Sequence, residues 1–205
     1  MKKVLVLCVC FATVLVLGMS DARAAGFGIY GSAGDGSSTW TVDRNSGFDV
    51  DVTHQGAGFV FDTAVAQDKF FNYQLNLGYD EFTNKTAGIS DLKLGGLMIS
   101  NAFGFGIVRT DGFRLWMGPE IRLAWPHGTQ PGVDYDFFGG GVGPVLGMNF
   151  NLPGTVSFVV KAGYIFMNYE GEADPVASYT YDFDIKERLI YVNIGILFRS
   201  TGDIF

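Results

Sequence analysis

Cysteine is almost absent from this sequence of 205 residues, and histidine is equally rare. The two cysteines, Cys8 and Cys10, lie near the N-terminus, and the two histidines are His54 and His127. Beyond the first 24 residues no apolar run approaches the roughly 18 to 20 residues of a transmembrane helix. A disulfide scaffold, a transition-metal centre and a bundle of membrane helices are therefore not expected.

Charge is also scarce, since only 17% of the residues are charged and acids outnumber bases by 21 to 14. The formal net charge of −7 leaves no basic surface for nucleic-acid phosphates. Hydrophobic residues make up 48% of the chain, which is too many for disorder. Glycine is abundant, and its 29 residues are about twice the average share.

The N-terminus has the organisation of a secretion signal. Lys2 and Lys3 precede an apolar run from Val4 to Met19, and the small-residue triplet Ala22-Arg23-Ala24 follows at once. We predict that residues 1–24 are a cleaved signal peptide and that residues 25–205 form one exported domain. An anchoring helix is the alternative, but the run is short for one. Cleavage would remove both cysteines, three bases and one acid, so the net charge would change from −7 to −9.

Strict alternation of apolar and polar residues dominates the rest of the chain. Phe71, Tyr73 and Leu75, for example, alternate with asparagine and glutamine, as in a strand with one apolar and one polar face. The alternation is strong in residues 71–79, 113–125, 142–150 and 190–198, and weaker in 26–33, 53–63, 94–108 and 156–168. The sequence therefore predicts eight strands.

The polar face of these strands is rich in glycine. It includes Gly56, Gly58, Gly78, Gly104, Gly106, Gly118, Gly139, Gly141, Gly143, Gly147, Gly163 and Gly195. Glycine in strands is expected where space is short, as inside a narrow barrel. The apolar face would then point into lipid, which is the reverse of a soluble sandwich or lipocalin-like barrel. We therefore predict an all-β fold, an eight-stranded antiparallel up-and-down transmembrane β-barrel.

The connections alternate in length. Those at 64–69, 109–112 and 151–154 are short, whereas those at 34–52, 80–91, 126–136 and 170–186 are long and contain most of the acids. Short periplasmic turns and longer extracellular loops are typical of outer-membrane barrels, so both termini are expected in the periplasm. Aromatic residues near the expected strand ends suggest two interfacial girdles: Phe61, Phe71, Tyr79, Phe82, Trp125, Phe138, Phe150, Tyr164, Tyr169, Tyr181 and Phe198.

Three further runs strengthen this interpretation: Asn-Tyr-Gln-Leu-Asn-Leu-Gly at 72–78, Arg-Leu-Trp-Met-Gly-Pro at 114–119, and the apolar final strand ending at Phe198. With them the chain resembles the small OmpA/OmpX-type bacterial outer-membrane barrels. The resemblance implies a bacterial outer-membrane location, contact with outer-membrane lipids and lipopolysaccharide, insertion by the barrel assembly machinery and a monomeric state. It does not fix a function, because anchors, adhesins, narrow channels and a few lipid-A-modifying enzymes share the architecture. The assembly signal of such proteins is a terminal Phe, and either Phe198 or Phe205 could fill that role.

Several ionisable residues are expected to face the barrel interior. They are Asp62, Asp80, Arg114, Glu120, Arg122 and Lys161, together with Trp116. If paired residue numbers in strands 113–125 and 142–150 sum to 263, Trp116 lies opposite Gly147, Glu120 opposite Gly143 and Arg122 opposite Gly141. These side chains form either a path for small polar solutes or, as we favour, a satisfied network that fills the lumen.

Pro119 and Pro144 fall on the apolar faces of neighbouring strands and are paired in the same register. Each removes a donor from the ladder. We expect either a β-bulge that adds curvature, which is the simpler reading, or a lateral gate for apolar molecules.

Catalysis and metal binding have little support. His54 has Val52 and Gly56 at the same-face positions, His127 is expected in a loop, and neither has a serine at that spacing, so no catalytic site is predicted. The acidic groups follow no recognisable ion loop and are expected to be solvated loop acids: Asp49/Asp51, Asp134/Asp136, Glu170/Glu172/Asp174 and Asp182/Asp184. No metal or cofactor is predicted. The leading hypothesis is a non-enzymatic outer-membrane barrel with a structural or surface-interaction role. The alternative is a narrow passive channel for small polar or apolar solutes, and a lipid-A-modifying enzyme is a distant third.

Overall fold

A computed structural model describes residues 25–43, 47–63, 69–85, 91–175 and 180–199. The predicted signal peptide and Phe205 lie outside these residues, so their roles stay predictions. Within the described part of the chain, no helix is long and apolar enough to cross a membrane.

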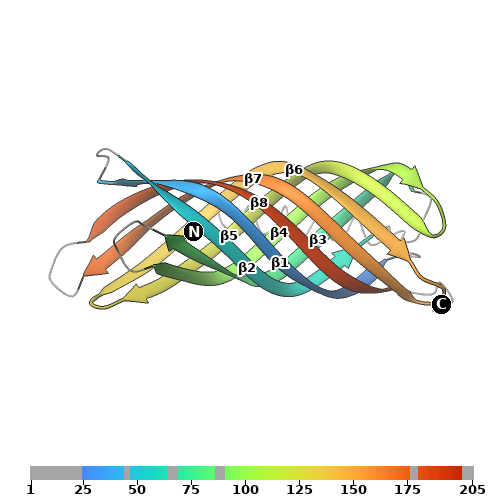
Figure 1. Ribbon diagram of the computed structural model, residues 1–205, viewed down its shortest axis with the longest axis horizontal. Helices are drawn as coiled ribbons and strands as arrows, with labels where there is room; N and C mark the ends of the chain where they lie inside the picture. The colour runs from blue at the N-terminus through green and yellow to red at the C-terminus, as the bar shows by residue number, and fades with distance from the viewer. Residues whose placement is uncertain (1–24, 44–46, 64–68, 86–90, 176–179, 200–205) are drawn as a thin grey trace, which may run out of the picture.

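Eight antiparallel strands close into a barrel in chain order, with β1 pairing to both β2 and β8. The barrel is longer than it is wide, and its strands run obliquely to the long axis (Figure 1). The strands are β1 (Gly26–Val42), β2 (Phe48–Asp62), β3 (Phe71–Lys85), β4 (Leu92–Arg109), β5 (Phe113–Gln130), β6 (Val133–Asn151), β7 (Val156–Pro175) and β8 (Tyr181–Arg199). The predicted fold class is confirmed.

The register between β5 and β6 is the predicted one. Trp116 pairs with Gly147, Glu120 with Gly143 and Arg122 with Gly141. Pro119 likewise pairs with Pro144, and the register does not shift on either side of them. The prediction of a β-bulge at the prolines is therefore wrong. The ladder shifts instead between β4 and β5, at Gly106/Val108.

The strands are much longer than the alternation predicted, and most of the described residues expected in the four long loops belong to strands. β1 continues through residues 34–42, β2 begins at Phe48, and β5 extends through His127 to Gln130. The acids expected in loops, such as Asp134, Asp136 and Glu170, are thus strand residues with exposed side chains. The error has a physical reason: alternation continues in these segments, but the two faces exchange polarity.

Around one half of the barrel the outward side chains are apolar. On β8 they are Ile190, Val192, Ile194, Ile196 and Phe198, and the intervening residues are buried inside. We call the ring of exposed apolar side chains the apolar belt. Its members on the other strands include Phe27, Ile29, Phe59, Phe71, Leu77, Tyr79, Leu97, Phe105, Ile107, Met117, Ile121, Trp125, Phe138, Val142, Leu146, Phe150, Phe158 and Phe166.

Beyond the belt the outward side chains become polar, and we call this part of the barrel the outer half. On β8 the change falls between Ile190 and Arg188, and Lys186, Asp184 and Asp182 follow on the same face. Other outward residues of the outer half are Asp35, Ser37, Thr39, Asp49, Asp51, Gln55, Glu81, Lys85, Lys93, His127, Asp134, Asp136, Asn168, Glu170, Glu172 and Asp174. The inward residues there are mostly apolar, as in a soluble barrel.

The glycines of the inner face make room for large side chains on neighbouring strands. A Cβ at Gly147 would lie 2.1 Å from Cε2 of Trp116, and one at Gly104 would lie 2.6 Å from Cε3 of the same ring. A Cβ at Gly163 would similarly meet the ring of Tyr191. Large side chains therefore lie against glycines of neighbouring strands, as the predicted register required.

Candidate functional site: the barrel interior

A buried ion cluster occupies the middle of the barrel. Glu120 accepts hydrogen bonds from Arg122, with its Oε1 3.0 Å from Nη2, and its Oε2 lies 3.0 Å from Nζ of Lys161. The Tyr191 hydroxyl donates to the same Oε2. All three charged side chains are 1% exposed, so each is removed from solvent and must be paired within the barrel.

The cluster is fixed by contacts from several strands. The Arg122 guanidinium lies 4.3 Å from the centre of the Tyr191 ring, a cation–π arrangement. Lys161 also lies 3.4 Å from Oγ of Ser100. Strands β4, β5, β7 and β8 thus converge on Glu120, and the side chains span the lumen at this level.

A second polar cluster lies nearer the strand ends at Asp62. The Asp62 Oδ2 accepts hydrogen bonds from the amides of Gln74 and Asn149, each at 3.3 Å. Asn149 in turn accepts from Nε1 of Trp116 at 3.3 Å. The Arg114 Nη2 donates to Asn72 at 3.4 Å. The residues of this cluster are buried, so it also fills its section of the lumen.

Asp80 belongs to a third contact. Its Oδ2 lies 2.8 Å from Nε2 of His54, and both side chains are fully buried. The His54 ring is also tilted against Phe82, with the centroids 5.2 Å apart. Nδ1 of His54 has no hydrogen-bond partner, and no serine hydroxyl of the described residues bonds to this ring. The arrangement is a buried hydrogen-bonded pair and does not resemble a serine nucleophile with its base.

The structure therefore places all seven predicted interior residues inside the barrel but distributes them over three groups. Sequence reasoning missed Tyr191, His54 and Asn149 as members of these groups. Their inward positions follow from alternation alone, so that signal was available. Which carboxylate each one meets depends on the register of strands that are distant in sequence.

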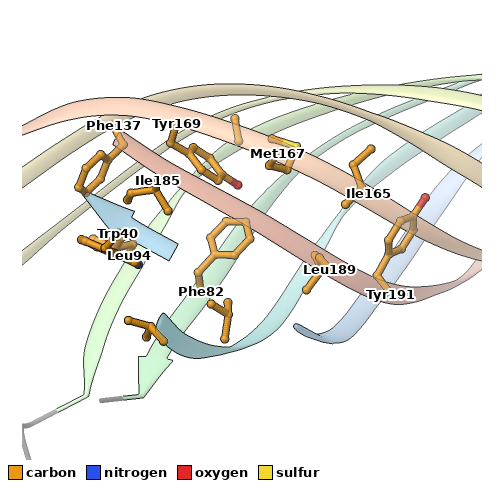
Figure 2. Packing of buried hydrophobic residues seen from close by; sticks show 13 residues of the cluster. Trp40, Phe82, Leu94, Phe137, Ile165, Met167, Tyr169, Ile185, Leu189 and Tyr191 are labelled. Carbon is orange, nitrogen blue, oxygen red and sulfur yellow. The ribbon is translucent and has the colours of Figure 1, made fainter. Parts of the chain in front are cut away.

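An apolar cluster closes the outer half of the interior. Trp40 packs edge-on against Phe137 and Phe183, with centroid distances of 5.6 Å to each. Phe137 also meets Phe183 edge-on at 6.2 Å. We call Trp40, Phe137 and Phe183 the aromatic cap. Figure 2 shows Trp40 and Phe137 at one end of the cluster and Tyr191 at the other.

Below the cap the cluster is continuous. Its buried members are Val50, Val52, Phe82, Leu94, Ala124, Ile165, Met167, Tyr169, Ile185, Leu189 and Tyr191. Phe82 and Tyr169 were expected in the interfacial girdles, which is wrong because they are 4% exposed and point inward. The cavity left among Trp40, Phe82, Leu94 and Tyr169 is only about 10 Å³. That is at most the size of one water molecule, so the apolar cluster fills the lumen at this level.

Backbone pairing is interrupted beside the two prolines. The ladder between β4 and β5 skips Phe103 and Gly104, and the ladder between β6 and β7 skips Gly143 and Pro144. Proline has no N–H to donate, which accounts for part of this loss. The result is a patch with reduced backbone pairing in the wall next to the ion cluster.

The outer half carries acidic side chains directly opposite one another. Glu170 pairs with Asp184 across β7 and β8, and Glu172 pairs with Asp182. With Asp43 these residues line a surface hollow of about 660 Å³. Like charges in this position repel. Among the described residues, no group of three or more His, Cys, Asp and Glu side chains is arranged to hold a metal ion.

Comparison with solved structures finds a similar barrel fold in a bacterial outer-membrane protein. The outer-membrane protein OprG from Pseudomonas aeruginosa superimposes with a TM-score of 0.65 and 12% identity over 87% of this chain and 96% of that chain. Neisserial surface protein A follows with a TM-score of 0.39, 13% identity and coverage of 81% and 96%. The transport unit of the autotransporter AIDA-I from Escherichia coli has a TM-score of 0.34, 11% identity and coverage of 92% and 97%.

The chain thus has the closed, eight-stranded fold of a small outer-membrane β-barrel. At 12% identity the likeness to OprG shows the fold alone. No protein-family model matches the sequence, and no curated protein matches it.

Proposed function

We propose that this protein is a non-enzymatic barrel of the bacterial outer membrane that has no through-channel and serves as a structural or surface-interaction element. The apolar belt supports the membrane location, because exposed apolar side chains in this number suit lipid and not water. The termini would lie on the periplasmic side. The outer half would project from the membrane as a rigid, largely acidic stem.

The observation that carries the proposal is the double closure of the lumen. Glu120, Arg122 and Lys161 fill one level, and the apolar cluster under Trp40 fills another. A polar solute would have to break buried ion pairs at the first level and lose its hydration at the second. Both steps are costly, so the closure argues against passive diffusion of polar solutes.

The test is ion conductance across a planar lipid bilayer that contains the refolded protein. We expect no conductance above that of a protein-free bilayer. The Trp40→Ala and Arg122→Ala double variant removes one large side chain from each level and should conduct, provided it migrates as a folded barrel on an unboiled gel. Steady single-channel conductance by the unsubstituted protein would overturn the proposal.

A lateral path for apolar molecules is a second candidate, supported by the interrupted ladders beside Pro119 and Pro144. Phe105 and Met117 are paired across β4 and β5, next to the interruption between these strands. Directly paired positions suit a disulfide, so the Phe105→Cys and Met117→Cys double variant would clamp β4 to β5. Faster entry of a long-chain hydrocarbon into protein-containing vesicles that is lost on oxidation and regained on reduction would support this path. Entry no faster than in protein-free vesicles would exclude it.

A further inference from the structure

An acid, Glu187, points into the apolar cluster of the outer half. It lies on β8 between Ile185 and Leu189, which Figure 2 labels, and is 5% exposed. It lines the same cavity of about 10 Å³ as Trp40 and Tyr169. A carboxyl group in such surroundings is either neutral or in need of hydrogen-bond donors.

The carboxyl group of Glu187 is not hydrogen-bonded at its buried oxygen. Among the described residues, nothing donates to Oε1 of Glu187, and the hydroxyl of Tyr169 is likewise without a partner. Directly opposite Glu187 on β1 is Ser38, which is 2% exposed. The Ser38 Oγ accepts a hydrogen bond from Nε1 of Trp40 at 2.9 Å. Glu187 is therefore paired with the residue that fixes the indole of the aromatic cap.

The charged side chains that face Glu187 from other strands are engaged elsewhere. Arg122 of β5 is bonded to Glu120, and Asp80 of β3 is hydrogen-bonded to His54 of β2. In the described outer half, the inward residues of β1, β4 and β6 include no acid and no base. Glu187 thus has no dedicated counter-ion.

These surroundings make the charge of Glu187 sensitive to pH near neutrality. Burial raises the pKa of its carboxyl group to about 7, while the attraction of Arg122 is opposed by Asp80. Burial also raises the pKa of the phenols of Tyr135 and Tyr169, so these stay neutral in this range. The neutral acid suits an apolar cluster, but the ionised form needs water, and the cavity has room for one molecule at most. More water can enter only if the aromatic cap moves.

We propose that the apolar cluster opens and closes with pH: the aromatic cap shuts it while Glu187 is neutral, and water enters it when Glu187 is ionised. The proposal rests on the closed lumen proposed above and adds its regulation. The ion cluster around Glu120 closes a different level, so opening hydrates the outer half without creating a path through the barrel. Because the pKa of Glu187 is raised in the closed form, the advantage of that form is complete below pH 4.5 and is lost as the pH rises through about 7.

The experiment is hydrogen exchange of the Trp40 indole N–H, followed by NMR of the full chain with isotope-labelled tryptophan, refolded in detergent micelles. The reference is Glu187→Gln, a neutral side chain of nearly the same size. We expect the exchange rate of the unsubstituted protein, relative to this variant, to increase by roughly two orders of magnitude between pH 4.5 and about 8. The indole of Trp116, which donates to Asn149 in the second polar cluster, is the internal control, and its relative rate should not change.

Glu172→Gln is the matched control variant, because Glu172 is an exposed acid of the same half, and it should exchange as the unsubstituted protein does. A relative rate for Trp40 that does not depend on pH would overturn the proposal. A pH-dependent increase that persists in Glu187→Gln and disappears in His54→Gln would also overturn it, because the switch would then be the His54–Asp80 pair. If Glu187→Gln does not fold, as judged by migration before and after boiling, Glu187→Leu provides the reference.

The closed lumen itself is tested separately. Ion conductance by the unsubstituted protein would contradict the closure, whatever the exchange rate of Trp40. A non-conducting protein whose Trp40 exchange does not respond to Glu187 would overturn the pH dependence alone.

Discussion

The two halves of the barrel fill their narrow lumen with side chains of opposite polarity. Within the belt, β8 points Ile194 outward and Asn193 inward, whereas in the outer half it points Lys186 outward and Ile185 inward. The same strand therefore changes from a membrane-type to a water-type arrangement without a break in its ladder to β7. Side-chain polarity thus changes between the two halves of the barrel, while the pairing of β8 with β7 is continuous.

The largest expected effect concerns the buried ion cluster. Glu120→Gln would leave Arg122 and Lys161 buried without their carboxylate, and we expect it to lower the free energy of unfolding by about 3–5 kcal/mol. Urea titration of the refolded protein in lipid vesicles measures it. The matched control, Glu81→Gln, breaks the partly exposed pair with Lys93 and should change stability by less than about 1 kcal/mol. Equal losses would mean that the interior is hydrated.

A lysine scan on one strand sharpens the boundary between the halves. Val142 and Asp136 both point outward on β6, one within the belt and one beyond it. Val142→Lys places a charge against lipid and should destabilise by about 2–4 kcal/mol in vesicles. Asp136→Lys should be neutral within about 0.5 kcal/mol or slightly stabilising. Similar effects at the two sites would contradict the membrane boundary.

The inner glycines give a third contrast. Gly147→Ala would press a methyl group against Trp116, and we expect a loss of about 1–3 kcal/mol in the same unfolding assay. Gly31→Ala, on the outer face, should change stability by no more than about 0.5 kcal/mol because its surroundings are open. A tolerated alanine at position 147 would show that the Trp116 ring is not held in place.

The smallest expected effect lies in the acidic stem. Glu170→Lys would place a base opposite Asp184 and should raise the free energy of unfolding by about 0.2–1 kcal/mol at low salt. The gain should shrink in high salt, since exposed charges are screened. No salt dependence would indicate that these carboxylates do not repel one another.

The fold was predictable because the belt is long and regular. Apolar alternation identified all eight strands, and the glycines identified the crowded side, from which the Trp116–Gly147 register followed. The outer half was not predictable by the same rule. There Trp40, Phe82 and Ile185 point inward, while the outward face is polar, so a search for an apolar outer face ends the strand too early.

The sequence predicted which residues face the interior, but it did not predict how they group there. Alternation assigned Glu120, Arg122 and Lys161 to the lumen correctly. Their grouping around Tyr191, and the separate pairing of Asp80 with His54, depend on side-chain reach across strands. Sequence spacing within one strand carries no information about that reach.

The position of the belt can be tested most directly by spin-label accessibility along β8. Single cysteines at positions 184, 186, 188, 190, 192, 194 and 196, in a chain with Cys8 and Cys10 replaced by serine, would be labelled and refolded into vesicles. We predict that labels at 190–196 are reached by oxygen dissolved in the lipid and that labels at 184–188 are reached by a water-soluble nickel complex. Access of the nickel complex to all seven positions would contradict the account, because the barrel would then lie in water along its whole length.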